Sequence, residues 1–560
     1  MRTLRIAALS LLSLSMAAFA QTVPPPVKSA EGSIDPEKIR AHVKFLSDDL
    51  LEGRGPGLRG DEIAAQYIAT QFALYGLKPG GDDGTFLQQV NFVGTKTIGD
   101  KTHFSLAPKK PDGGMSIDLH SYDLKYADDY TVSNRTLTPS VDVDAPIVFV
   151  GYGAVAPEFS WNDYAGVDVK GKVILCIVGD PPSDDPKFFG GKALTYYGRW
   201  TYKFEEAARQ GAIGALIIHR TDLASYGWDV VKNSNTSEKT YLRDNKDPQL
   251  AAASWIQLDV ARQLFKAANL DLDTEMTAAG KKGFKAVELS VRLQAHIESA
   301  VRSFQSPNVV GILPGANVAE HKPDQAVMYT AHHDHLGFVP GMAGDNIYNG
   351  AADNATGCGM LLEMARAWAA SGIKPPHSAV FAAVAAEEQG LLGSEYLGQH
   401  PPIPSAQIAL DINYDMILPI GVPRQVNVNG AQRTTFYPTV QATAKRFDLT
   451  IVPDARPQAG SYYRSDHFSL SRVGIPAFSV EQGELFEGHD EAWGLAKAKD
   501  FVDHDYHNFS DNYHADWDFK GNAKLLRFGM ELGWEAISAP KMIQWLSGDE
   551  FEAARKASQK

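Results

Sequence analysis

The sequence predicts an α/β protein with a mostly parallel sheet flanked by helices. The first observation is the stretch 378–394, which opens with an uninterrupted apolar run typical of a parallel strand buried on both faces. The second is that two more apolar runs, at 325–334 and 406–416, have the same character. The third is the segment 349–368, where Gly and Asn residues indicate a tight loop followed by the apolar pattern of a helix.

Side chains that can bind a metal stand at the ends of these three strands and in the loop. They are His332, Asp334, Asp353, Glu387, Glu388 and Asp415. Because ligands bind at the carboxyl ends of strands in open α/β sheets, we expect these side chains to meet at one rim. An isolated Glu-Glu pair is more often a pair of solvated acids. Here three strands each end in side chains that can bind a metal, which favours a shared site. Imidazole and carboxylate ligands without sulfur are typical of catalytic zinc rather than of a structural cysteine site.

Composition indicates a globular protein of more than one domain. The chain has 560 residues, of which 44% are hydrophobic and 21% charged, so it can bury a large core. Its formal net charge of −14 argues against a nucleic-acid partner, because phosphate contacts need a basic surface. The only cysteines, Cys176 and Cys358, do not indicate a disulfide framework, and we expect two buried free thiols.

The first residues predict export from the cytoplasm. Two arginines precede an apolar core, and Ala-Phe-Ala at 18–20 supplies a cleavage site with small residues, so residues 1–20 are expected to be a signal peptide. The mature protein would then be periplasmic or extracellular. No second stretch is long and apolar enough to cross a bilayer, so we expect no stable membrane insertion. Residues 21–34 are expected to be a linker, because Pro-Pro-Pro resists helix and sheet alike.

The remaining pattern divides the chain into two domains. Residues 35–125 form the first part of the α/β domain and begin with two amphipathic helices around a Gly-rich loop at 53–60, which lacks the Lys and Ser/Thr of a phosphate-binding loop. Short β-rich runs separated by Gly, Asp and Pro indicate an inserted domain at 126–290. The α/β pattern then resumes over 291–545, which carries the metal site, and a C-terminal tail follows at 546–560.

The inserted segment resembles a protease-associated domain. The resemblance rests on FVGYG at 149–153 and on the segments 162–175 and 203–218. It implies a β-rich domain that lies over the active site of a peptidase and influences access of the substrate.

The α/β segments resemble the co-catalytic di-zinc exopeptidases, a family that includes bacterial leucyl aminopeptidases, glutamate carboxypeptidase, glutaminyl cyclases and the transferrin receptor. The motifs that carry this resemblance are TAHHDHLGF, NGAADNATG, AAEEQGLLGSEYL, NYDM, SDHFSL followed by GIPAF, and YHNFSDNY. They occur in the family's order, and the resemblance as a whole spans residues 35–125 and 295–540. The resemblance implies two Zn²⁺ ions per chain.

The resemblance also implies a set of five metal ligands. His332 and Asp415 would bind one zinc ion, Glu388 and His507 the other, and Asp353 would bridge both. The last histidine is chosen because the pattern Tyr-His-x-x-x-Asp fits residues 506–511, with His514 as the alternative.

Three further roles are implied in the same way. Glu387 would be the general base that takes a proton from a water shared by the two metals, and Asp334 would orient the imidazole of His332. Tyr462, or alternatively Tyr463, would help to hold the oxyanion.

These residues lead us to expect an exported di-zinc metallo-aminopeptidase that removes N-terminal residues from peptides with a free N-terminus. Two zinc ions bring four positive charges, which three ligand carboxylates and a bridging hydroxide balance. A carboxypeptidase of the same family is an alternative, for which Arg464 would supply a cationic clamp. A receptor-like binding module without catalysis is another, but such a module would be expected to have lost ligands, and here none is missing.

Overall fold

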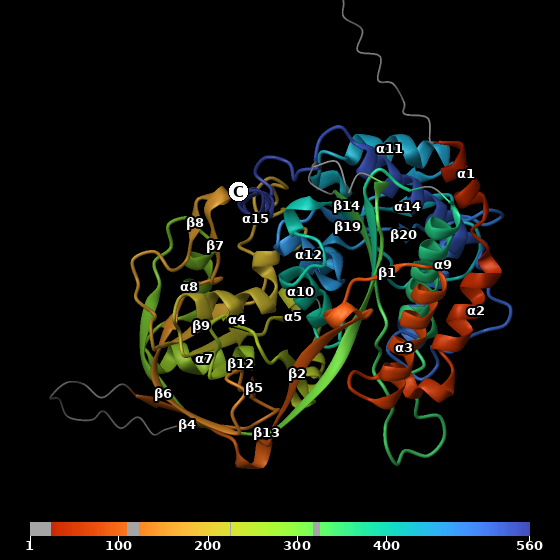
Figure 1. The fold of residues 1–560 in the computed structure, drawn as a ribbon. Coiled ribbons are helices and arrows are strands. Elements are labelled where there is room, and N and C mark those ends of the chain that lie inside the picture. Colours follow the sequence, from red (N-terminus) through yellow and green to blue (C-terminus); the bar gives the residue numbers. More distant parts are fainter. Residues whose placement is uncertain (1–23, 109–121, 225, 317–324, 373) are drawn as a thin grey trace, which may run out of the picture.

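The structure is a computed structural model that describes residues 24–108, 122–224, 226–316, 325–372 and 374–560. The signal peptide predicted at 1–20 lies outside these residues. Figure 1 shows two lobes that share one long curved strand, β13 (Val287–Leu313). We call residues 24–102 with 298–560 the main lobe, and residues 103–297 the inserted lobe.

Strand β13 joins the lobes because its two halves pair with different strands. Its first half is antiparallel to β3 (His103–Pro108) and β6 (Ser140–Phe149) of the inserted lobe. Its second half is antiparallel to β2 (Leu87–Thr97) and β15 (Ser378–Val384) of the main lobe. The inserted lobe therefore begins with β3, before the expected limit at 126, and the expected limit at 290 falls inside β13.

Four parallel strands form the part of the main lobe that carries the predicted metal ligands. They run in the order β15, β14 (Ala326–His332), β16 (Ile408–Asn413) and β19 (Ala477–Ser479). The register pairs His332 with Val384 and Thr330 with Asn413, so the strands end at a common edge. The predicted α/β class is confirmed, and the whole sheet is mixed because β13 and β2 are antiparallel.

Helices cover both faces of these strands. In β14 the odd-numbered residues pack with α9 (Thr356–Ala370) and α14 (Lys520–Ser538). The even-numbered residues Ala326 and Met328 pack with α10 (Leu392–Gln399) and α12 (His467–Arg472). A strand covered on both faces needs apolar residues at every position, which is why uninterrupted apolar runs predicted these strands.

The inserted lobe also has a parallel centre. Strands β6, β9 (Val173–Ile177), β10 (Gly214–Ile218) and β12 (Ala252–Ile256) are parallel, and β5 (Tyr130–Ser133) adds an antiparallel edge. Helices α4 (Trp200–Arg209) and α7 (Leu258–Ala267) pack on opposite faces of this sheet. The lobe is therefore itself α/β at its centre, beyond the β-rich pattern predicted for it.

Smaller elements complete the described chain. The helices are α5 (Thr221–Ala224), α6 (Trp228–Thr236), α8 (Leu272–Ala279), α11 (Tyr437–Arg446), α13 (Glu491–His504) and α15 (Glu552–Ser558). The strands are β1 (Lys78–Pro79), β4 (Tyr122–Leu124), β7 (Val155–Ala156), β8 (Trp161–Asn162), β11 (Lys239–Leu242), β17 (Gln425–Asn427), β18 (Thr450–Ile451) and β20 (Glu481–Gln482).

The described part of the predicted linker at 21–34 is a packed helix, α1 (Pro25–Gly32), and the prediction of a linker is wrong there. Prolines in the first turn leave the helix intact, because the first backbone N–H groups of a helix have no partner within it. Val27 is 1% exposed, and Arg527 donates hydrogen bonds to the carbonyls of Glu31 (3.0 Å) and Ile34 (2.7 Å). The segment therefore belongs to the main lobe.

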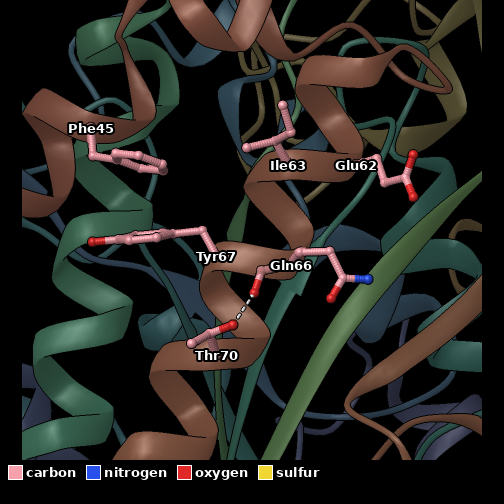
Figure 2. A pocket seen from close by; sticks show the side chains of 6 residues that line it. All are labelled: Phe45, Glu62, Ile63, Gln66, Tyr67 and Thr70. Atoms are coloured by element: carbon pink, nitrogen blue, oxygen red, sulfur yellow. Dashed lines mark hydrogen bonds between the residues drawn. The ribbon is translucent and has the colours of Figure 1, made fainter.

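The two helices predicted around the Gly-rich loop are α2 (Pro36–Leu46) and α3 (Arg59–Leu74). Asp35 caps α2 by accepting a hydrogen bond from the backbone of Glu37. A shallow hollow lies between these helices (Figure 2), lined by Phe45, Glu62, Ile63, Gln66, Tyr67 and Thr70. It contains none of the predicted metal ligands.

Two further predictions concern the cysteines and the membrane. Cys176 and Cys358 are both free and buried, as predicted. Among the described residues, no helix has the length and apolar character needed to span a membrane.

His42 on α2 makes the stability of the fold depend on pH. Burial lowers the pKa of His42 from 6.5 to about 4, and the positive charge of Arg366 contributes. The unfolded chain then binds a proton that the folded chain does not, so stability is present above pH 6.5 and is lost as the pH falls toward 4. The imidazole is held between Tyr67 (2.8 Å) and Tyr75 (3.3 Å).

We expect His42→Gln to remove this part of the pH dependence. In urea unfolding, the loss of free energy of unfolding between pH 7 and pH 4.5 should be smaller in the variant by about 2 to 3 kcal/mol. An equal loss in both proteins would show that His42 accepts a proton in the folded state without penalty.

Candidate metal centre

The ends of three parallel strands and one loop bring the predicted ligands together. His332 is the last residue of β14, Glu388 follows β15 and Asp415 follows β16. Asp353 lies in a turn, Ala351–Ala355, that leads into α9 and in which its own backbone is not helical. The rim predicted from the apolar runs is therefore present in the structure.

The carboxylate of Asp353 lies between two groups of ligands. Its Oδ1 is 3.3 Å from Nε2 of His332, and the same nitrogen is 3.3 Å from Oδ1 of Asp415. Its Oδ2 is 3.2 Å from Nε2 of His507, and that nitrogen is 3.0 Å from Oε2 of Glu388. One oxygen of Asp353 thus faces each group, which is the arrangement of a bridging ligand.

The structure also chooses among the histidines near the C-terminal end of the domain. His507 joins the cluster, whereas the ring of His514 lies against Trp517, with ring centres 5.6 Å apart. His489 stacks on Trp493, with ring centres 3.8 Å apart. Of the two candidates for the last ligand, His507 is the one that contacts Asp353.

Two residues far apart in the sequence hold the loop of Asp353. Asp511 accepts hydrogen bonds from the backbone N–H groups of Ala352 (2.8 Å) and Asp353 (3.0 Å). Arg54, in the Gly-rich loop, is 1% exposed and donates to the carbonyls of Asn349 (2.7 Å) and Gly350 (2.9 Å). It also donates to the carbonyl of His333 at 2.8 Å, so one guanidinium ties the loop of Asp353 to the end of β14.

Other side chains orient the ligands themselves. His335, which was not predicted from the sequence, has its Nδ1 2.7 Å from Oε1 of Glu388, the oxygen that does not face His507. Ser465 was not predicted either, and its hydroxyl donates to Oδ2 of Asp415 at 2.6 Å. Asp334 acts on His332 mainly through its backbone, because its carbonyl is 3.2 Å from Nδ1 and its carboxylate 3.8 Å. The run His-His-Asp-His was the only sequence signal for His335.

Glu387 lies beside the cluster without a partner of its own. A carboxylate oxygen of Glu387 lies within 4.8 Å of ligand atoms of His332 and Glu388. Its backbone N–H donates to Asp334 at 3.0 Å, and its carboxylate has no hydrogen bond or ion pair with another described residue. Burial raises the pKa of Glu387 well above its ordinary value.

The structure corrects the prediction for Tyr462. Its hydroxyl is 2.7 Å from that of Ser471 and donates to the carbonyl of Ala477 at 3.2 Å, so the phenol points into the core beside β19. The alternative, Tyr463, donates to Glu550 at 2.8 Å. A position in a motif does not fix which way a side chain turns, and both phenols already have partners.

Tyr506 is a tyrosine at the rim that the sequence analysis gave no role of its own. Its ring stacks on His507, with ring centres 3.9 Å apart, and the residue is 39% exposed. Burial of the hydroxyl and the charges of Asp353 and Glu388 raise the pKa of Tyr506 well above its ordinary value. The phenol therefore stays neutral and keeps its proton beside the cluster.

The donor set fits a pair of zinc ions. Each side of Asp353 offers one imidazole nitrogen and one further carboxylate, which gives three protein ligands per ion and leaves a position open. Although burial disfavours its charged form, the carboxylates of Glu388 and Asp353 raise the pKa of His507 to about 10. A metal must displace that proton, so metal binding at this cluster would release protons.

Part of this chain, including the cluster, is similar to a known family. Residues 308–526 match the model of peptidase family M28. The chain is 27% identical over 250 residues to leupeptin-inactivating enzyme 1 of Streptomyces exfoliatus, a match that covers 43% of this chain and 51% of the relative. It is 40% identical over 96 residues to a probable zinc metalloprotease of Pyrenophora tritici-repentis (strain Pt-1C-BFP), which covers 17% and 21%. The chain thus spans about half, or less, of the length of these relatives.

Solved structures with a similar chain are zinc aminopeptidases and related proteins. An aminopeptidase from Aneurinibacillus sp. strain AM-1 is 19% identical, with 91% of this chain and 96% of that chain covered and a TM-score of 0.49. A zinc aminopeptidase from Bacillus subtilis is 17% identical, with 92% and 98% covered and a TM-score of 0.40. The matched residues 308–526 contain all five candidate ligands, and the match of this segment to peptidase family M28 agrees with the predicted relationship to zinc exopeptidases.

Proposed function

We propose that this protein is an exported di-zinc aminopeptidase that removes N-terminal residues from peptides. The observation that carries the proposal is the shared carboxylate of Asp353, which faces one histidine and one further carboxylate on each side. The match of residues 308–526 to peptidase family M28 supports the class of enzyme, a zinc metallo-exopeptidase. Export is proposed from the composition of residues 1–20 alone.

The residues that would hold the two ions follow from the contacts. His332, Asp415 and Asp353 would hold one ion, and His507, Glu388 and Asp353 the other. The chemistry that a zinc pair supplies when bound is Lewis acidity, toward water and toward the scissile carbonyl. Three ligand carboxylates would balance most of the charge of such a pair. The side chains of Asp353 and Glu388 are only 5% and 3% exposed.

Glu387 is placed to move the proton. Its carboxylate is close to the ligands but has no partner among the described residues, so it is free to accept a proton from the attacking water and return it to the leaving amine. The ring of Tyr506 stacks on the ligand His507, and its neutral hydroxyl would donate a hydrogen bond to the developing oxyanion.

We expect Glu387→Gln to keep zinc and lose turnover. General base catalysis contributes roughly two to four orders of magnitude, so kcat for a leucyl arylamide should fall by about that factor. N-acetylation of the same substrate should abolish turnover by the unmodified enzyme, because an aminopeptidase needs the free amine. Turnover of the acetylated substrate would contradict an aminopeptidase, because that substrate has no free amine.

Zinc content should follow the assignment of ligands. Purified protein should hold about two zinc ions per chain, Asp353→Ala should lose both, and His507→Ala should lose at least one, because each change removes a ligand from the stated group. His514→Ala is the matched control and should keep both ions. The zinc content is measured by plasma emission spectroscopy after dialysis. Two zinc ions in Asp353→Ala would show that Asp353 is not the bridging ligand.

A pair of tyrosine variants separates the two candidates for the oxyanion donor. Tyr506→Phe should lower kcat by about two to three orders of magnitude, the usual effect of losing one such donor, with a smaller change in KM. Tyr462→Phe should leave kcat within about threefold, since its hydroxyl is bonded to Ser471 and Ala477. The reverse result would restore the role that the sequence predicted for Tyr462.

A further inference from the structure

Three polar side chains interrupt the apolar strands β14 and β16 just before these strands reach the metal centre. Thr330 of β14 and Asp411 and Asn413 of β16 are each 0% exposed. The register pairs Thr330 with Asn413, and Asp411 lies two residues earlier on the same face of β16. A buried polar group costs free energy unless it is hydrogen-bonded, and packing of the sheet alone would be served by apolar residues here. These three residues therefore need another explanation.

The three side chains form a hydrogen-bond network that ends on a metal ligand. The hydroxyl of Thr330 is 2.9 Å from Oδ1 of Asn413, and 3.2 Å and 3.3 Å from the two carboxyl oxygens of Asp411. Nδ2 of Asn413 donates to the hydroxyl of Ser465 at 2.7 Å. That hydroxyl donates to Oδ2 of Asp415 at 2.6 Å. The network thus runs from Asp411 to Asp415 without a gap.

The donor at each contact of the network follows from the ligand at its end. Asp415 is a carboxylate when it binds a metal and can only accept, so Ser465 directs its one proton to it. Ser465 then accepts from the amide nitrogen of Asn413, and this places the amide oxygen toward Thr330. The hydroxyl of Thr330 therefore donates to Asn413, and its contact with Asp411 needs a proton on the carboxyl group.

The surroundings of Asp411 favour that proton. Burial raises the pKa of Asp411 well above its ordinary value, and the negative charge of Asp466 raises it further, whereas the hydrogen bond with Thr330 lowers it. A neutral carboxyl group has one O–H donor. Every proton of the network then points toward Asp415.

The network acts on one oxygen of one ligand. Oδ2 of Asp415 accepts from Ser465, while Oδ1 is 3.3 Å from Nε2 of His332, on the side of the cluster. A hydrogen bond to Oδ2 leaves Oδ1 to bind the metal. Partners of this kind orient a ligand and tune its affinity for the metal. Glu388, in the other group of ligands, contacts His335 instead, so the network serves the group of His332.

We propose that Asn413 and Thr330 are positioning residues for the zinc ion that His332 and Asp415 would bind. They act through the hydroxyl of Ser465, which they hold in the orientation that donates to Asp415. The inference rests on the proposed function, since it needs zinc at this cluster. Asparagine suits its place in the network, because one amide accepts from the hydroxyl on one side and donates to the hydroxyl on the other.

Zinc affinity tests the proposal without any turnover. Competition with a chelator gives the two zinc dissociation constants of each variant. Asn413→Ala and Ser465→Ala should each raise at least one constant by about 10- to 100-fold, the usual cost of removing a partner behind a metal ligand. The double variant should bind zinc no more than about threefold more weakly than Ser465→Ala, because Asn413 acts through that hydroxyl. A double variant that loses the product of the two single losses would overturn the proposal.

A pair of variants at Thr330 tests the proposal even where Asn413→Ala fails to fold by circular dichroism. Thr330→Val keeps the shape but removes the hydroxyl, and it should raise a zinc dissociation constant by about tenfold. Thr330→Ser keeps the hydroxyl and should stay within about threefold of the unmodified protein. Equal zinc affinity in the two variants would show that the hydroxyl has no role, and would overturn the proposal.

Ser479→Ala is the matched control. Ser479 is the register partner of Asn413 on β19 and is 1% exposed, like the residues of the network. Its hydroxyl donates to Glu481 at 2.5 Å and so lies outside the network. Zinc affinity should be unchanged in this variant, and a loss as large as that of Asn413→Ala would overturn the proposal, because any buried polar group would then matter.

The unmodified protein separates this inference from the proposed function. An unmodified protein that binds no zinc would contradict the proposed function and, with it, the positioning role. Two zinc ions bound equally tightly by the unmodified protein and by Asn413→Ala would overturn the positioning role alone and leave the proposed function intact.

Discussion

The carboxylate of Asp353 is the group on which the rest of the site depends. Each of its oxygens faces a different histidine, and two further carboxylates stand next to those histidines. Several buried acids at one rim repel each other, and their burial is costly without positive charge. The histidines supply part of that charge in the protein alone, and a pair of divalent cations would supply the rest. The fold therefore favours the binding of cations at this edge of the sheet.

The position of Asp353 is fixed by contacts from opposite ends of the sequence. Arg54 comes from the first helices and Asp511 from the C-terminal part of the domain, and both bind the backbone of the loop rather than the carboxylate. The side chain is thus left free for the cluster while its backbone has little room to move. Precise placement of this kind matters for catalysis, because a misplaced ligand changes both metal affinity and the reacting geometry.

The sequence predicted that His332, Glu388 and Asp415 meet at one rim, because their positions are local consequences of strand endings. An apolar run shows where a strand stops, and parallel strands that stop together bring their next residues to one edge. Arg54, His335 and Ser465 could not be found in this way, because their partners lie far away in the chain and no periodicity marks them. The direction of the Tyr462 side chain could not be predicted either, because no sequence pattern shows which partners a hydroxyl finds. Its hydroxyl contacts Ser471 and Ala477 instead of the cluster.

The inserted lobe forms a wall beside the site, where Thr240 donates to Gln389, the neighbour of Glu388, at 3.3 Å. Strand β13 passes from one lobe to the other without a break, and β11 of the inserted lobe pairs with β2 of the main lobe. Opening the lobes would break this pairing together with the ion pair between Arg472 and Glu205. A rigid wall selects substrates by the groups it presents, and that selection would act on the shape and charge of the peptide beyond the bond that is cut.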